Sequence, residues 1–161
     1  MAPGGNGDDF FVRWQDGRIV VTSARSALNG YQKGHCFYCF APISAEGGND
    51  GADVDHFFPW AVRAHLDCNI NGVWNLVLAC KSCNRGEGGK FDLVPSQSLI
   101  ARLHKRNEFL INSHHPLRET LMLQSGQVEE QRANFLQKNY EAAVMHRIAR
   151  WDPIQRAMAM F

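Results

Sequence analysis

Two Cys-x-x-Cys pairs limit what this chain can fold into more than any other feature. Cys36 and Cys39 form the first pair, and Cys80 and Cys83 form the second. Each pair is spaced to hold one metal ion from a tight turn, and four thiolates suit a closed tetrahedral zinc site. Such a site adds folding free energy and leaves no open position for catalysis. The sequence therefore predicts one structural zinc ion.

The first residues lack the basic patch and the apolar stretch of a signal peptide, and no apolar run approaches the about 18 residues of a membrane span. We therefore expect a cytoplasmic protein without a membrane partner, in which disulfides are disfavoured. Four ordinary buried cysteines explain the pattern less well than zinc does, and a redox site would need only one pair. The fifth cysteine, Cys68, is expected to fill apolar space.

The composition fits a globular domain, and the nearly balanced charge does not by itself indicate a nucleic-acid partner. The 161 residues are 45% apolar, and 17 Lys and Arg balance 16 Asp and Glu. Residues 1–95 carry 8 basic and 10 acidic side chains, a net of −2, whereas residues 96–161 carry 9 and 6, a net of +3. Any surface that faces phosphates is therefore expected to draw on the second half of the chain.

The chain divides into four segments by composition. These are a flexible N-terminus (1–9), a hairpin with a short helix (10–34), a core rich in Cys, His, Asn, Asp and Gly (35–95), and a helical extension packed on that core (96–161). Turn and capping signals predict a hairpin over 10–21 around Asp16-Gly17, a helix over 22–28, a strand over 73–79, and helices that begin near Ser96, span 117–123 and run from Val128 to Trp151.

A second pattern lies between and after the cysteine pairs. It reads Asp53-Val-Asp-His-Phe-Phe-Pro59, then Trp74-Asn-Leu-Val-Leu-Ala-Cys80, then Asn84-Arg-Gly-Glu-Gly-Gly-Lys90. Asp-His-x-x-Pro, followed by Asn-Leu-x-x-x-Cys-x-x-Cys-Asn and a nearby Lys, resembles the HNH nuclease family. It is similar to the HNH domain of RNA-guided DNA nucleases, in which Asn replaces the last His. The resemblance covers residues 36–90 and implies an α+β fold: a ββα-metal core with a structural zinc knuckle, an N-terminal β-hairpin and C-terminal helices.

The residues of this pattern suit phosphodiester hydrolysis. A neutral imidazole can take a proton from water near pH 7, which makes His56 the candidate general base. A divalent cation offsets the negative charge of the transition state, and magnesium prefers oxygen ligands. Asp55 and Asn84 supply such oxygens, as the family pattern also implies, for one Mg²⁺ with Mn²⁺ tolerated. The resemblance further implies that Asn75 braces the loop carrying His56 through backbone hydrogen bonds.

The end of the motif departs from the family, which often has Asn-x-x-Lys after the last cysteine. Glu87 stands at that offset and the next lysine is Lys90. Either the intervening glycines let Lys90 turn back to contact a phosphate, or that contact is lost. Separately, Glu87 could lie close to the metal and raise the affinity for it. Basic side chains expected to contact the DNA backbone are Arg85, beside Asn84, and, on one helix side, Arg102, Lys105 and Arg106.

The combined pattern predicts a metal-dependent endonuclease that hydrolyses DNA, with double-stranded DNA as the partner. The resemblance implies 5′-phosphate and 3′-hydroxyl ends. One site nicks one strand, so cleavage of both strands would need a homodimer, a second visit or a larger nuclease or targeting assembly. Two alternatives stay open: a non-catalytic zinc module that binds nucleic acid or protein, and an RNA-directed nuclease, since nothing in the sequence reads a 2′-hydroxyl.

Overall fold

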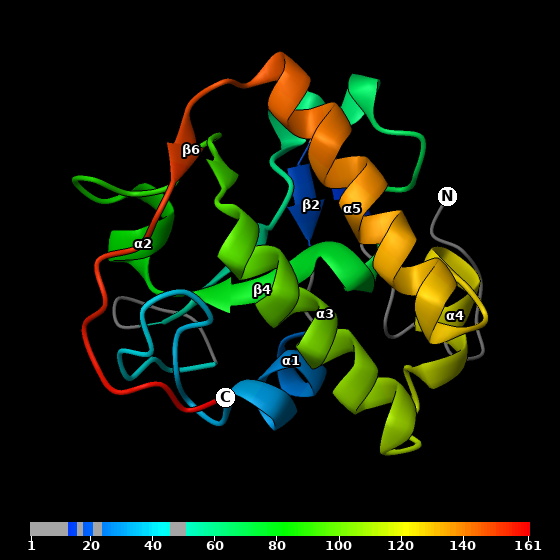
Figure 1. Cartoon of the computed structure of the whole chain (residues 1–161). Coiled ribbons are helices and arrows are strands. Elements are labelled where there is room, and N and C mark those ends of the chain that lie inside the picture. The colour runs from blue at the N-terminus through cyan, green and yellow to red at the C-terminus, as the bar shows by residue number, and fades with distance from the viewer. Residues whose placement is uncertain (1–12, 16–17, 21–23, 46–50) are drawn as a thin grey trace.

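Helices and short strands are mixed in the computed structural model, which describes residues 13–15, 18–20, 24–45 and 51–161 (Figure 1). The elements are β1 (Arg13–Gln15), β2 (Arg18–Val20), α1 (Ala24–Gln32), β3 (Asp53–His56), η2 (Trp60–His65), η3 (Val73–Asn75), β4 (Leu76–Ala79), α2 (Lys81–Arg85), β5 (Val94–Pro95), α3 (Gln97–Asn112), α4 (Arg118–Ser125), α5 (Glu129–His146) and β6 (Arg150–Trp151); η denotes a 3₁₀ helix. The pairs β1–β2 and β3–β4 are antiparallel, whereas β5–β6 is parallel. No helix in the described residues is both long and apolar enough to cross a bilayer.

The antiparallel pair β3–β4 lies at the centre of the molecule. Its register places Asp53 opposite Ala79 and His56 opposite Leu76. All four residues of β4 are buried, as expected for a short, entirely apolar strand. The side-chain amide of Gln32 in α1 donates to the Leu78 carbonyl and accepts from the Leu78 N–H. It therefore supplies hydrogen-bond partners to the backbone of β4 on the side where no strand pairs with it.

The C-terminal helices pack on this centre. Helix α3 begins after Ser96 and buries the apolar stripe that the sequence predicts, namely Leu99, Ile100, Leu103, Leu110 and Ile111. Arg132 of α5 holds α3 through two 2.7 Å hydrogen bonds to the carboxylate of Glu108. In Figure 1 the chain then passes from α5 through β6 and runs beside α2 toward the loop that follows α1.

Several predicted boundaries differ from the structure. The strands β1 and β2 pair within the predicted hairpin, but its turn at Asp16-Gly17 lies outside the described residues, as do residues 1–9 and the helix start at 22–23. Helix α1 continues through Gly30 to Gln32, because its last turn carries the buried glutamine that caps β4. The predicted strand over 73–79 begins only at Leu76, after the 3₁₀ turn η3. The division of the chain near residues 35 and 96 stays a prediction.

The prediction that the last helix continues to Trp151 is wrong. Helix α5 ends at His146, and Trp151 belongs to β6 instead. The position of Trp151 matches helical periodicity, but its ring is buried edge-on against Tyr38 at 5.0 Å between ring centroids. Its indole N–H donates to the Gly88 carbonyl at 2.9 Å. The tryptophan therefore closes the C-terminal segment over the region that follows α2.

The predicted basic face of α3 is not one exposed surface. Arg106 is 0% exposed and donates to the backbone carbonyls of Val73, Trp74 and Leu76. Arg102 is partly buried and donates to the carbonyls of Phe37 and Tyr38. Only Lys105 of the three is exposed. The expected DNA contact therefore does not fit Arg106, because its guanidinium is buried and hydrogen-bonds α3 to η3 and β4.

Replacing Arg106 with methionine is expected to lower the free energy of unfolding by about 3 kcal/mol, because carbonyls at η3 and β4 lose a charged donor while staying buried. Lys105→Met, one residue earlier and on the exposed side, is the matched control and should change it by less than about 0.5 kcal/mol. Urea unfolding of both variants measures the difference. Equal stability of the two variants would contradict the structural role of Arg106.

Candidate metal centres and catalytic residues

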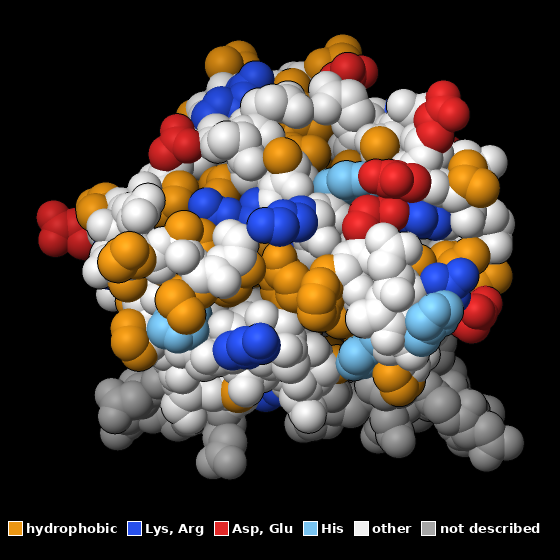
Figure 2. Space-filling view, turned by 60° about the horizontal axis from the view of Figure 1, so that its bottom comes forward, with side chains coloured by type: hydrophobic (Ala, Val, Ile, Leu, Met, Phe, Trp, Pro, Cys, Tyr) orange, Lys and Arg blue, Asp and Glu red, His pale blue; other side chains and the backbone are white. Residues whose placement is uncertain are grey.

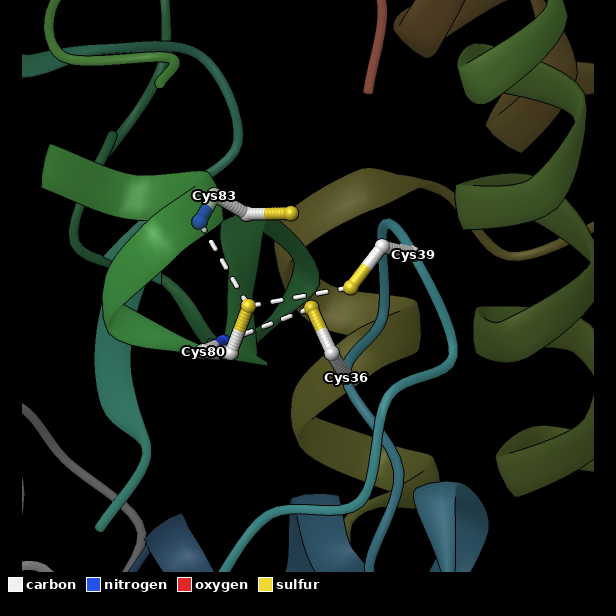
Figure 3. A group of neighbouring side chains, drawn as sticks. All are labelled: Cys36, Cys39, Cys80 and Cys83. Atoms are coloured by element: carbon white, nitrogen blue, oxygen red, sulfur yellow. Dashed lines mark hydrogen bonds between the residues drawn. The ribbon is translucent and has the colours of Figure 1, made fainter. Parts of the chain in front are cut away.

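Four cysteine side chains converge on one point, and they come from the two predicted pairs (Figure 3). Cys36 and Cys39 lie on the loop after α1, whereas Cys80 caps α2 and Cys83 lies within it. The four sulfur atoms lie within 4.8 Å of one another, and the Cys39 and Cys80 sulfurs are 3.7 Å apart. A tetrahedral zinc with bonds of about 2.3 Å separates its sulfurs by about 3.8 Å. The cluster therefore fits zinc, and Cys68 lies outside it.

The surroundings of the cluster favour thiolates. Backbone N–H groups of Tyr38 and Cys80 donate to Cys36 Sγ, and the Arg156 guanidinium donates to Cys83 Sγ at 3.3 Å. Hydrogen bonds among the thiols split their pKa values, lowering the pKa of Cys80 to about 6 and raising that of Cys83. Four thiols this close ionise together only when a cation neutralises them, which is the chemistry that a zinc ion supplies.

The neighbouring residues Asp55 and His56 sit at the end of β3 and lie on opposite faces of the strand, as pleating requires. Asp55 is 8% exposed, and its Oδ2 accepts a hydrogen bond from the Tyr38 hydroxyl at 2.6 Å. Lys90 Nζ forms an ion pair with this carboxylate, 3.1 Å from Oδ2, and donates a hydrogen bond to Oδ1 at 3.5 Å. Lys90 is 0% exposed and also donates to the His56 carbonyl at 2.8 Å. The lysine therefore lies in the interior beside the carboxylate, where it does not fit the expected contact with DNA.

Asn84 follows the cysteine cluster on α2 and faces the other acidic residue of β3. Its Nδ2 donates to Asp53 Oδ2 at 2.9 Å, and the Arg85 Nε donates to the same oxygen at 2.9 Å. Asp53 and Asp55 are two residues apart, so they lie on the same face of the strand. With its amide nitrogen committed to Asp53, Asn84 retains Oδ1 as its potential cation ligand. Carboxylate and amide oxygens are the types of ligand that magnesium and manganese prefer.

The imidazole of His56 is held by Asn71, which the sequence did not single out. His56 Nε2 lies 3.1 Å from Asn71 Oδ1, which can only accept, so Nε2 carries the proton and Nδ1 is the basic nitrogen. Burial lowers the pKa of His56 below its usual value, and the charge of Lys90 acts in the same direction. The hydrogen bond to Asn71 and the charge of Asp55 oppose that shift. The histidine is therefore neutral at pH 7.

Asn75 is fully buried in η3 and bonds only to backbone. Its Oδ1 accepts from the Phe58 N–H at 2.8 Å, and its Nδ2 donates to the carbonyls of Phe58 and Ile70. These bonds tie the segment after His56 to the loop that carries Asn71. Neither Asn71 nor Tyr38 has a spacing signal in the sequence, because each reaches its partner across 15 or 17 residues of chain.

The basic side chains that were expected to contact DNA differ in exposure. On the face that Figure 2 shows, Lys and Arg side chains are spread among apolar, acidic and histidine side chains. Arg85 is exposed beside Asn84 but already paired with Asp53, and Glu87 is exposed two residues later. Of the residues expected to meet DNA, Arg85 and Lys105 are the exposed ones, and Arg102, Lys90 and Arg106 are partly or fully buried.

Comparison with known proteins bears on the segment that builds both centres. The sequence model of the HNH endonuclease family matches residues 36–91, which run from the first cysteine of the cluster to the residue after Lys90. No curated protein and no solved structure matches the chain. The match contains β3, β4 and α2, and thus Asp55, His56 and Asn84. The segment 36–91 is therefore similar to the HNH endonuclease family, as the motifs predict.

Proposed function

We propose that this protein is a metal-dependent DNA endonuclease in which His56 is the general base and Asp55 and Asn84 bind the catalytic cation. One observation supports the proposal most: the segment that matches the HNH family contains all three residues, with the buried Asp55 and then His56 at the end of β3 and Asn84 hydrogen-bonded to Asp53 of the same strand. The β3–β4–α2 succession that holds these residues has the order of a ββα-metal core.

The chemistry follows from these side chains. His56 Nδ1 takes a proton from water as the water oxygen forms a bond to phosphorus. The bond from phosphorus to the 3′-oxygen breaks, and that oxygen takes a proton from solvent, which gives 5′-phosphate and 3′-hydroxyl ends. Asp55 Oδ1 and Asn84 Oδ1 would hold one Mg²⁺ or Mn²⁺. When bound, such a cation stabilises the charge that gathers on the phosphate and on the leaving oxygen.

The zinc cluster and the exposed basic side chains complete the proposal. The zinc ion has a structural role, because four cysteines leave it no open position. Arg85 lies beside the cation ligands and Lys105 lies on α3, and both are proposed to contact phosphates of a DNA duplex. Because the net charge of the chain is only +1, we propose that tight targeting needs a second copy of the chain or a larger assembly.

A plasmid assay tests the proposed function. Supercoiled DNA incubated with the zinc-loaded protein should be nicked with Mg²⁺ or Mn²⁺ and stay intact with EDTA. His56→Ala, purified in parallel, controls for contaminating nucleases. Cleavage of a matched RNA duplex in preference to DNA would favour the RNA-directed alternative. Binding without cleavage under either metal would show a non-catalytic zinc module instead.

The pH dependence of cleavage follows from the environment of His56. Because burial lowers the pKa of His56, the rate should reach its plateau before pH 7 and fall only below about pH 6.5, the usual histidine value. Since the Asn71 hydrogen bond raises that pKa, Asn71→Ala should move the acid limb to lower pH while reducing the plateau rate. Single-turnover rates from pH 5 to 8 measure both effects. An acid limb above pH 7 would contradict this assignment.

A further inference from the structure

Tyr38 touches the zinc cluster and the proposed cation site at the same time. It lies between Cys36 and Cys39, and its backbone N–H donates to Cys36 Sγ at 3.4 Å. Its hydroxyl donates to Asp55 Oδ2 at 2.6 Å, the short distance expected when the acceptor is ionised. The phenol is 1% exposed, and its pKa is raised well above the usual value by burial and by Asp55. The hydroxyl therefore stays protonated as a donor.

The phenol ring has little room to move. Its edge-on neighbours are Phe37 at 5.3 Å and Trp151 at 5.0 Å, and Phe57 stacks at 6.3 Å between ring centroids. These rings come from the cysteine loop, from β6 and from the residue after His56. The position of the hydroxyl is thus fixed by packing at one end and by the cysteine cluster at the other.

The contacts of Asp55 are unequal at its two oxygens. Tyr38 bonds to Oδ2, and Lys90 Nζ lies 3.1 Å from Oδ2 but 3.5 Å from Oδ1. Lys90 is also tied to the cluster, because its backbone N–H donates to the Cys83 carbonyl. Tyr38 therefore holds Oδ2 by a short hydrogen bond, whereas Oδ1 accepts the longer 3.5 Å hydrogen bond from Lys90 and is the less tightly held oxygen.

We propose that Tyr38 is a positioning residue that orients Asp55 for the divalent cation and couples the cation site to the zinc cluster. This inference rests on the proposed function above. The hydroxyl selects the carboxylate rotamer in which Oδ1 faces the cation, with Lys90 as the second donor. Removal of such an outer hydrogen bond typically costs 10–100-fold in metal affinity or activity.

The test compares two Tyr→Phe variants that each remove one buried hydroxyl. Tyr38→Phe removes the donor to Asp55, whereas the Tyr31 hydroxyl has no hydrogen-bond partner in the described residues, which makes Tyr31→Phe the matched control. Mn²⁺ binding to the zinc-loaded full chain is measured by electron paramagnetic resonance, together with zinc content and plasmid nicking. We expect Tyr38→Phe to keep its zinc, to bind Mn²⁺ at least tenfold more weakly and to need correspondingly more Mn²⁺ for half-maximal nicking. Tyr31→Phe should match the wild type in all three.

The outcomes separate this inference from the function on which it rests. If the wild type cleaves DNA and Tyr38→Phe binds Mn²⁺ within twofold of Tyr31→Phe, the positioning role is overturned and the nuclease assignment stands. Loss of zinc from Tyr38→Phe would also overturn it, because the hydroxyl would then support the cluster itself. A wild-type chain that neither binds Mn²⁺ nor cleaves would overturn both.

Discussion

His56→Ala is expected to slow cleavage of DNA by about 10²–10⁴-fold, the usual contribution of a general base. The substitution removes Nδ1, the nitrogen that the Asn71 hydrogen bond leaves free to accept a proton. The fold should survive, because the His56 side chain is partly exposed and its backbone carbonyl, which binds Lys90, is retained. Single-turnover nicking rates at saturating Mg²⁺ measure the loss, and circular dichroism checks the fold.

A second histidine provides the matched control for this prediction. His65 lies in η2 and is exposed, with its ring stacked at 3.5 Å on that of His146. His65→Ala should cleave at the wild-type rate. Asp55→Asn is a poorer probe, because it leaves the buried Lys90 without its carboxylate partner and confounds activity with stability. If His56→Ala nicks as fast as His65→Ala, another group takes the proton and the assignment of the base is wrong.

The features that could be predicted from the sequence depend on residues that lie close together along the chain. Cys-x-x-Cys spacing brings the two sulfurs of each pair together, and the pairing of two such turns at one metal ion is a common pattern, so the cluster could be predicted without knowledge of β3 or β4. The family match over residues 36–91 likewise depends on residues that are close in sequence within each motif. Because successive side chains of a strand point to opposite faces, the opposite directions of Asp55 and His56 could be predicted from their adjacent positions.

Contacts across the chain could not be predicted in the same way. Asn71 and Tyr38 reach His56 and Asp55 through loops whose paths have no periodic signal. The sequence left open whether Lys90 reaches a phosphate. In the structure this lysine is buried, which is rare for lysine, and its ion pair with Asp55 offsets the cost of burial. The burial of Arg106, in contrast, could have been predicted from its spacing in the sequence. This arginine lies three residues after Leu103 and four before Leu110, on the buried stripe of α3.

Cys80→Ser is expected to release the zinc ion and to lower the unfolding temperature by about 10 °C or more. Structural zinc binding is worth about 10–16 kcal/mol in small domains, and a change of 1 kcal/mol shifts unfolding by about 2–4 °C in a chain of this size. Cys80 also accepts the hydrogen bond that caps α2, whose next turn carries Asn84. The substitution should therefore weaken Mn²⁺ binding as well. Elemental analysis and thermal unfolding measure the first two losses.

Cys68→Ser separates loss of the zinc site from loss of a thiol. Cys68 lies outside the cluster, and its Sγ contacts Asn139 Oδ1 at 3.5 Å. Burial raises the pKa of Cys68 to about 11, so at pH 7 this sulfur is a neutral thiol rather than a metal ligand. The variant should keep one zinc ion per chain and unfold within a few degrees of the wild type. If Cys80→Ser retained as much zinc as Cys68→Ser, the four sulfurs would not be the zinc site, and the structural argument that places Asn84 and Tyr38 through that site would fail with it.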